Sequence, residues 1–161
     1  MSRGPFIVFG VLIAVVAVIA YAAFAKEGSE ESVPVPVEQA DEAAKEIFAT
    51  NCGTCHTLAA GGTDGVVGPN LDELIGGTPA SEEPSAEDKL TTYESSYGRV
   101  LAAVVCGREG RMPAGILQGS DAEEVAGFVA AYAGQLGEDE GPLVPADDRP
   151  TPEFTDSCES G

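Results

Sequence analysis

The sequence predicts a small all-α domain that follows one N-terminal membrane-spanning helix. Two observations lead to this prediction. A run of 20 uncharged residues occupies positions 6–25, and three later stretches place apolar residues at helical spacing. The sequence shows no Val- or Ile-rich alternating run that would form a sheet, since Val66-Val67 is too short. The length of 161 residues allows one domain with additional segments.

Composition excludes several functions before any motif is considered. The 27 acidic and 8 basic residues give a formal net charge of −19, which argues against nucleic-acid binding and against docking on anionic lipid. The single His excludes a three-His zinc site, bis-His haem ligation and a Ser-His-Asp triad beside a separate His site. Four cysteines are too few for a small disulfide scaffold.

Residues 1–25 are expected to form a transmembrane anchor. As a helix, the apolar segment would span about 30 Å, the thickness of a bilayer core. Arg3 precedes it and acidic residues follow Lys26 closely, so the positive-inside rule predicts a cytoplasmic N-terminus and an exported remainder. The alternative is a cleaved signal peptide, because residues 23–25 read Ala-Phe-Ala, but the apolar core of such a peptide runs only about 7–15 residues.

The rest of the chain divides into a linker, a domain and a tail. Residues 26–37 are polar and then contain two prolines, which is typical of a linker. Residues 38–136 carry the helical patterns and the motifs. Residues 137–161 are acidic and Pro-rich, and we expect this tail to lie on the domain or to be disordered.

Three helices are predicted within the domain, separated in part by a Gly/Pro-rich loop over 61–86. Apolar side chains fall on one face of each helix. The ranges are 38–50, a helix within 87–106 that is clearest over 93–105, and 120–136. The third range begins with Ser120 three residues before Glu123, which is the spacing of a capping box.

A five-residue motif at the end of the first helix indicates the chemistry. Residues 52–56 read Cys-x-x-Cys-His, the signature of c-type haem attachment. The Cys52 and Cys55 thiols are spaced to add to the two vinyl groups of one haem. His56, the only His in the chain, follows them directly and can ligate the iron from the same side.

Other uses of the cysteine pair are less well supported. A thioredoxin-type redox motif follows a buried strand in a βαβ unit, whereas Cys52 and Cys55 follow an amphipathic helix in a chain without Trp. A zinc site would need a second close pair of ligands, and Cys106 and Cys158 stand far apart. A structural disulfide between Cys52 and Cys55 would close a strained ring.

Met112 is the candidate for a second axial ligand. It is the only methionine besides Met1, and it lies in a loop of glycines, two arginines and Pro113 over 107–115. A lone Met more often fills a gap in a core, but this loop context does not suit a core position. Pro113 fixes the direction in which the chain leaves, so the loop can hold a thioether over a haem.

Residues 38–136 resemble a class I mono-haem cytochrome c, a small all-α fold wrapped around a covalent haem. Phe48 lies four residues before Cys52, as the aromatic residue of the family's first helix does. Residues 68–71 read Gly-Pro-Asn-Leu and match the family's Gly-Pro-x-Leu loop. The Gly-x-x-x-x-Met-Pro stretch ending at Pro113 resembles the family's methionine loop.

This resemblance implies a one-electron carrier rather than an enzyme. One haem c would be attached through two thioethers, and Pro69 O would accept the His56 Nδ1 proton, which fixes the ring and raises its basicity. The implied haem-binding residues are Cys52, Cys55, His56, Met112 and Pro69. Since His56, Met112 and four porphyrin nitrogens fill all six iron positions, no position is left for a substrate.

The expected setting is a membrane respiratory chain, with the haem domain on the periplasmic or extracytoplasmic side of the cytoplasmic membrane. A quinol-oxidising complex would donate electrons, and a terminal oxidase or reductase would accept them. The acidic surface would steer the domain toward a partner with a basic docking surface. Alternatives are a fixed subunit of a larger respiratory complex and a haem sensor, which would need Met112 to leave the iron. The sequence does not indicate an oligomeric state.

Two further expectations concern the surroundings of the haem. Some relatives place an Arg where Gly77 stands, to pair with a haem propionate, and Arg99, Arg108 or Arg111 could take that role here. The predicted apolar wall includes Phe48, Leu58, Leu71, Leu74, Leu101 and Val104.

Cys106 and Cys158 are expected to form a disulfide. Both are predicted to lie outside the cytoplasm, where disulfides persist, and the bond would tie the tail beside the methionine loop. The alternative is a buried Cys106 and a free Cys158.

Overall fold

The computed structural model describes residues 35–76, 84–137, 140–150 and 158. The predicted membrane segment at 6–25 and most of the predicted linker lie outside these residues. Within the described ranges, no helix is both long and apolar enough to cross a membrane.

The described fold is mostly helical, as predicted. Its helices are α2 (Glu42–Asn51), α3 (Leu71–Leu74), α4 (Ala86–Cys106) and α5 (Gly119–Tyr132), with the 3-10 turns η1 (Gln39–Asp41) and η2 (Ala146–Asp148). A small antiparallel hairpin of β1 (Thr57–Leu58) and β2 (Thr63–Asp64) was not predicted. Its two-residue strands are too short to produce an alternating pattern in the sequence.

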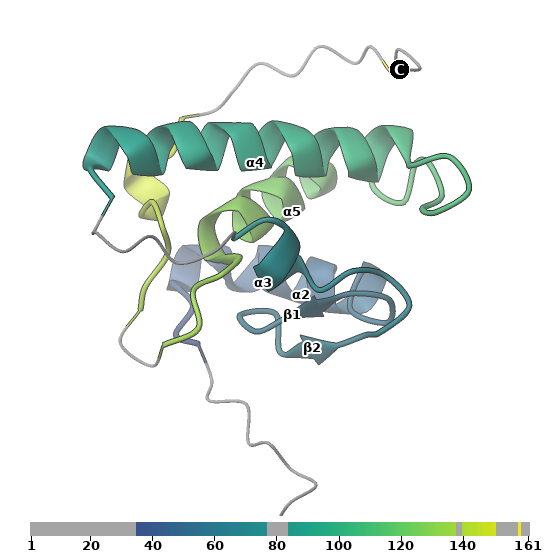
Figure 1. The fold of residues 1–161 in the computed structure, drawn as a ribbon, viewed down its shortest axis with the longest axis horizontal. Helices are drawn as coiled ribbons and strands as arrows, with labels where there is room; N and C mark the ends of the chain where they lie inside the picture. The colour runs from purple at the N-terminus through teal and green to yellow at the C-terminus, as the bar shows by residue number, and fades with distance from the viewer. Residues whose placement is uncertain (1–34, 77–83, 138–139, 151–157, 159–161) are drawn as a thin grey trace, which may run out of the picture. The chain divides into compact units, whose positions relative to one another are not determined.

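Helix α5 forms the centre of the core and contacts both α4 and α2 (Figure 1). All of its residues from Val125 to Tyr132 are buried. These residues are small or apolar, and the Tyr132 hydroxyl is their only polar side-chain group. The Phe128 ring lies 6.1 Å from the Phe48 ring of α2 and 5.1 Å from the Tyr132 ring. The sequence predicted burial of only one apolar face of this helix, whereas the structure buries every residue over 125–132.

Two predicted features of the helix ends are wrong. Ser120 does not cap the last helix, which begins at Gly119 without a side-chain cap bond. The capping box lies on α4 instead, where Ser85 and Asp88 bond reciprocally to each other's backbone N–H groups. The last helix also ends at Tyr132 rather than at 136, because the backbone becomes extended at the next residue and then turns at Gly134, whose φ is +83°.

The packed unit extends beyond the predicted domain boundaries of 38–136. Val35, from the predicted linker, is 5% exposed, and Val144, from the predicted tail, is 3% exposed. Leu143 N–H donates to Ala131 O of α5 at 2.7 Å. Residues 140–150 thus lie on the domain, which is one of the two states expected for the tail.

A buried ion pair joins the two ends of this unit. The Arg149 guanidinium donates to both carboxylate oxygens of Asp41, at 2.6 and 2.8 Å, and its Nε donates to Val144 O at 2.9 Å. The Tyr132 hydroxyl donates to the same carboxylate at 3.0 Å and accepts from Glu38 N–H at 2.8 Å. These bonds connect η1, α5 and the segment around η2.

Two tyrosines near this ion pair should titrate at unusually high pH. Burial raises the pKa of Tyr93 to about 12 and that of Tyr132 to about 12. A tyrosine of the unfolded chain has a pKa of about 10, so below about pH 10 these two groups are protonated in both states. Between about pH 10 and 12 the unfolded chain loses the phenol protons while the folded protein keeps them, so the free energy of unfolding falls as pH rises. Phenolate absorbance in an alkaline titration should show both transitions above those of the urea-unfolded protein. The chain has four tyrosines, so ionisation of three or more of them near pH 10 while the protein remains folded would contradict this expectation.

The expected disulfide between Cys106 and Cys158 is present in the structure, with Cα atoms 5.4 Å apart. Cys106 is the last residue of α4, directly before the loop that carries Met112. The bond closes a loop with a sequence separation of 52.

Replacing both Cys106 and Cys158 with Ser should lower the free energy of unfolding by at most about 4 kcal/mol, the loop-closure entropy of such a ring. Urea unfolding of the wild type and the double variant measures the difference. Thiol titration of the denatured, unreduced haem-bound wild type is the check on the bond itself. We expect no free thiol there, and two titratable thiols would show that the bond does not form.

Candidate haem-binding site

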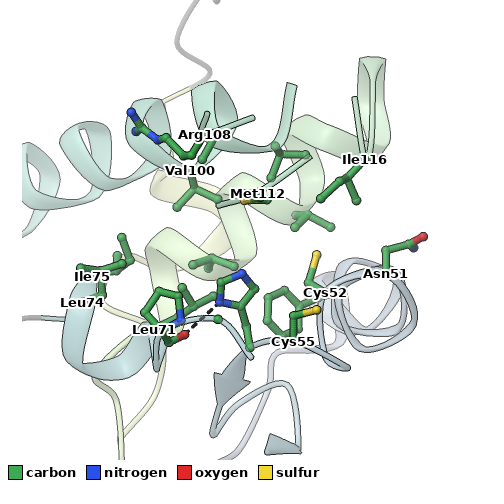
Figure 2. Close-up of a pocket in the computed structure, with 18 of the residues that line it drawn as sticks. Asn51, Cys52, Cys55, Leu71, Leu74, Ile75, Val100, Arg108, Met112 and Ile116 are labelled. Atoms are coloured by element: carbon green, nitrogen blue, oxygen red, sulfur yellow. Dashed lines mark hydrogen bonds between the residues drawn. The ribbon is translucent and has the colours of Figure 1, made fainter. Parts of the chain in front are cut away.

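A cavity of about 460 Å³ lies among α2, α3, α4 and the loop that follows α4 (Figure 2). Its volume falls within the range of about 300–1,000 Å³ that small-molecule and cofactor sites occupy. The predicted haem-binding residues all line it, namely Cys52, Cys55, His56, Met112 and Pro69. Most of the other lining residues are apolar, including Phe48, Leu71, Ile75, Val100, Val104, Ile116, Val125 and Val129.

The two cysteines lie on a turn that follows α2 directly. Cys52 N–H donates to Phe48 O at 2.8 Å, and the N–H groups of Cys55 and His56 both donate to Cys52 O, at 3.0 and 2.9 Å. A side chain at Gly53 would collide with Thr63 of β2 and with the α2 backbone, so the turn needs glycine there. Figure 2 shows both sulfurs on the α2 side of the cavity.

The thiol of Cys52 has a raised pKa. Burial is the main cause, the neighbouring Cys55 is the lesser one, and together they raise the pKa to about 11. At neutral pH the side chain is therefore a thiol rather than a thiolate. A redox-active Cys-x-x-Cys motif depends on the opposite shift, a lowered pKa that supplies the attacking thiolate.

The His56 ring is held by the Gly-Pro loop. His56 Nδ1 lies 2.9 Å from Pro69 O, and since a carbonyl can only accept, Nδ1 is the donor and Nε2 is left for a ligand bond. A Cβ at Gly68 would lie 2.5 to 2.9 Å from three atoms of the ring. Gly68 N–H donates in turn to Cys55 O at 2.7 Å, which fixes the loop against the motif.

Met112 is positioned by a tight backbone turn. Its N–H donates to Arg108 O at 2.9 Å, and its carbonyl accepts from Arg108 N–H at 2.8 Å. Gly110, at the tip of this turn, has φ of +67°, and Gly107, where α4 ends, has φ of +72°. Figure 2 shows Met112 on the α4 side of the cavity, away from the cysteine turn.

The expected wall of the site is only partly correct. Leu71 and Leu74 line the cavity, as do Phe48 and Val104. Leu58 and Leu101 do not line it, and both belong to the buried core of the protein.

Arg99, Arg108 and Arg111 all line the cavity. Gly77, where some relatives place a propionate-binding Arg, lies outside the described residues. Two other described cations are already paired, Lys45 with Glu42 and Arg149 with Asp41. Neither of these two ion pairs of the described residues involves a cavity arginine, so within that part of the chain all three are open to a bound anion.

These features define a c-type haem protein: a helical fold, an apolar cavity of cofactor size, two thiols beside it, and nitrogen and sulfur donors that line it. The family model for cytochrome c matches residues 42–132, which is more than half of the chain. The chain therefore belongs to the cytochrome c family, whose members bind covalent haem c and are typically electron carriers rather than enzymes. Comparisons with curated proteins and with solved structures give no match.

Proposed function

We propose that this cytochrome c is a one-electron carrier of a membrane electron-transport chain, with its haem iron ligated by His56 and Met112. The observation that supports the proposal is that both side chains line the same cavity as Cys52 and Cys55. Haem c, when bound there, supplies reversible one-electron chemistry.

The residues around the cavity have two opposing effects on the reduction potential of a bound haem. The bond from His56 to Pro69 O fixes the ring and makes it a stronger donor, which favours ferric iron. The apolar lining excludes water and disfavours the additional positive charge of ferric iron, and a methionine ligand raises the potential further. With two axial ligands in place, no iron position remains for a substrate, which supports a carrier over an enzyme.

Two alternatives receive less support from the geometry. A thiol-disulfide oxidoreductase would need an activated thiolate, and the raised pKa of Cys52 works against it. A haem sensor would need Met112 to leave readily, whereas both backbone groups of Met112 are bonded to Arg108. A fixed subunit of a respiratory complex remains compatible with the same site, and purification in mild detergent separates the two cases because a shuttle elutes alone.

Spectroelectrochemical titration of the full-length protein tests the carrier assignment. We expect one reversible transition with a one-electron slope, and no carbon monoxide binding by the reduced protein. Rapid binding of carbon monoxide would instead indicate an open iron position and a sensor or an enzyme.

We further propose an extracytoplasmic location, with residues 6–25 as the anchor, a quinol-oxidising complex as the donor and a terminal oxidase or reductase as the acceptor. The net charge of −19 supports a partner with a basic docking surface.

Small redox reagents of opposite charge should report this steering. Electron transfer with a cationic metal complex should slow as ionic strength rises, and transfer with an anionic complex should accelerate, because salt screens attraction and repulsion alike. Stopped-flow rates between about 0.01 and 0.15 M salt cover a change of Debye length from about 30 to about 8 Å. The reverse pattern would show that the three cavity arginines, rather than the net charge, control the approach.

A further inference from the structure

Asp72 is a buried carboxylate with no part in the haem ligation proposed above. It lies on α3 and is 6% exposed. Neither ion pair among the described residues includes it. Burying a charge is costly unless hydrogen bonds compensate for the lost water, so the bonds of this carboxylate indicate what it holds in place.

Both oxygens of the carboxylate accept backbone N–H groups. Oδ2 accepts from Ala59 N–H at 2.9 Å, and Oδ1 accepts from Gly134 N–H at 3.0 Å. Ala59 lies three residues after His56, and Gly134 lies just beyond the end of α5. The Asp72 side chain therefore joins α3 to two segments, the one that follows His56 and the one that follows α5.

The segment that carries Asp72 also carries the partner of the axial histidine. Pro69, whose carbonyl accepts from His56 Nδ1, stands three residues before Asp72. Between them, the Asn70 side chain caps α3 by accepting from Asp72 N–H at 2.9 Å. The position of the Pro69 carbonyl thus depends on how firmly this short helix is held.

Close backbone packing at the other end of α3 shows that the helix has little freedom to shift. A Cβ at Gly76 would overlap the backbone of Gly134, and a Cβ at Gly134 would lie 2.7 Å from Gly76 Cα. Asp72 accepts the Gly134 N–H group at this same contact.

We propose that Asp72 is a positioning residue for the axial ligand: it holds α3 so that Pro69 O stays aligned with His56 Nδ1. The inference rests on the proposed role of His56 as an iron ligand. Aspartate suits the task because each of its two oxygens accepts one N–H group. An asparagine could serve only one of them, since its NH₂ group would face the other donor.

The test compares Asp72→Asn with Glu73→Gln in the haem-bound, full-length protein. Glu73 is the exposed neighbour of Asp72 on α3, and its replacement removes the same charge without removing a buried backbone bond. NMR of the reduced proteins follows solvent exchange of the His56 Nδ1 proton beside exchange of buried α5 amides such as Val129. The reduction potential of each variant is recorded on the same samples.

We expect Asp72→Asn to speed exchange of the His56 Nδ1 proton about tenfold or more, the scale of one lost buried hydrogen bond. Exchange of the α5 amides should change much less. The potential should rise, because a weaker His56 bond and the loss of a buried negative charge both favour ferrous iron. Glu73→Gln should leave both exchange rates near their wild-type values.

Unchanged His56 exchange, or equal acceleration of His56 and the α5 amides, would overturn the positioning role and leave only a contribution to overall stability. If Asp72→Asn does not fold, Asp72→Ser keeps one small acceptor and allows the same comparison. Failure of the proposed function is recognised separately, because the wild type itself would then lack the spectrum of His/Met-ligated haem.

Discussion

Asp41→Asn should lower the free energy of unfolding by about 3–5 kcal/mol, because it leaves the Arg149 guanidinium buried without its counter-charge. The two side chains are 8% and 10% exposed, and they share two hydrogen bonds at 2.6 and 2.8 Å. The Arg149 guanidinium also lies 6.0 Å from the Tyr93 ring and 5.9 Å from the Tyr132 ring. It therefore has little access to water once its partner is neutral.

Urea unfolding of the haem-bound protein measures this effect, and the chain offers a matched control. Glu42→Gln removes an exposed ion pair with Lys45, whose charged atoms are 3.9 Å apart and whose side chains are 57% and 33% exposed. Its loss should cost at most about 0.5 kcal/mol. Adding Arg149→Met to Asp41→Asn should recover part of the lost stability, because no charge is then left buried. If Asp41→Asn lowers the free energy of unfolding as little as Glu42→Gln does, the Asp41–Arg149 pair does not stabilise the fold as expected.

Met112→Leu should convert the carrier into a protein that binds carbon monoxide. Leucine nearly conserves the volume of methionine, so the loss of stability through packing should stay below about 1.5 kcal/mol. The substitution removes the thioether and with it the proposed second axial ligand. The oxidised variant should lose the far-red charge-transfer band of Met-ligated ferric haem, and its potential should fall.

Glu109→Gln is the control for this substitution. Glu109 is exposed on the same turn, between Arg108 and Gly110, and it does not line the cavity. The Glu109→Gln variant should have the absorption spectrum and reduction potential of the wild type, and like the wild type it should not bind carbon monoxide. If Met112→Leu keeps the far-red band, another group ligates the iron and the assignment of Met112 is wrong.

The parts of the site that could be predicted are those encoded by short spacings. Cys52, Cys55 and His56 are neighbours in sequence, and the loop with Pro69 follows within 13 residues, so a local pattern identifies them. The helical ranges followed from apolar periodicity in the same way. The position of Met112 at the cavity was predictable for another reason: the chain contains few methionines, and its loop context does not suit a core.

The parts that could not be predicted depend on contacts between distant segments. Asp41 and Arg149 are separated by 108 residues, and nothing in the local sequence distinguishes this acid among 27. Asp72 is equally unremarkable in sequence, because its role comes from backbone groups that the fold brings to it. Leu58 and Leu101 were wrongly assigned to the haem wall, since periodicity identifies an inward face but not what that face contacts.

The absorption spectrum of the purified, oxidised protein tests the central proposal most directly, when it is recorded on a sample whose intact mass has been measured. We expect the mass of one covalently attached haem together with the far-red band of Met-ligated ferric iron. A chain without attached haem, or one whose haem lacks that band, would contradict a His56/Met112-ligated electron carrier.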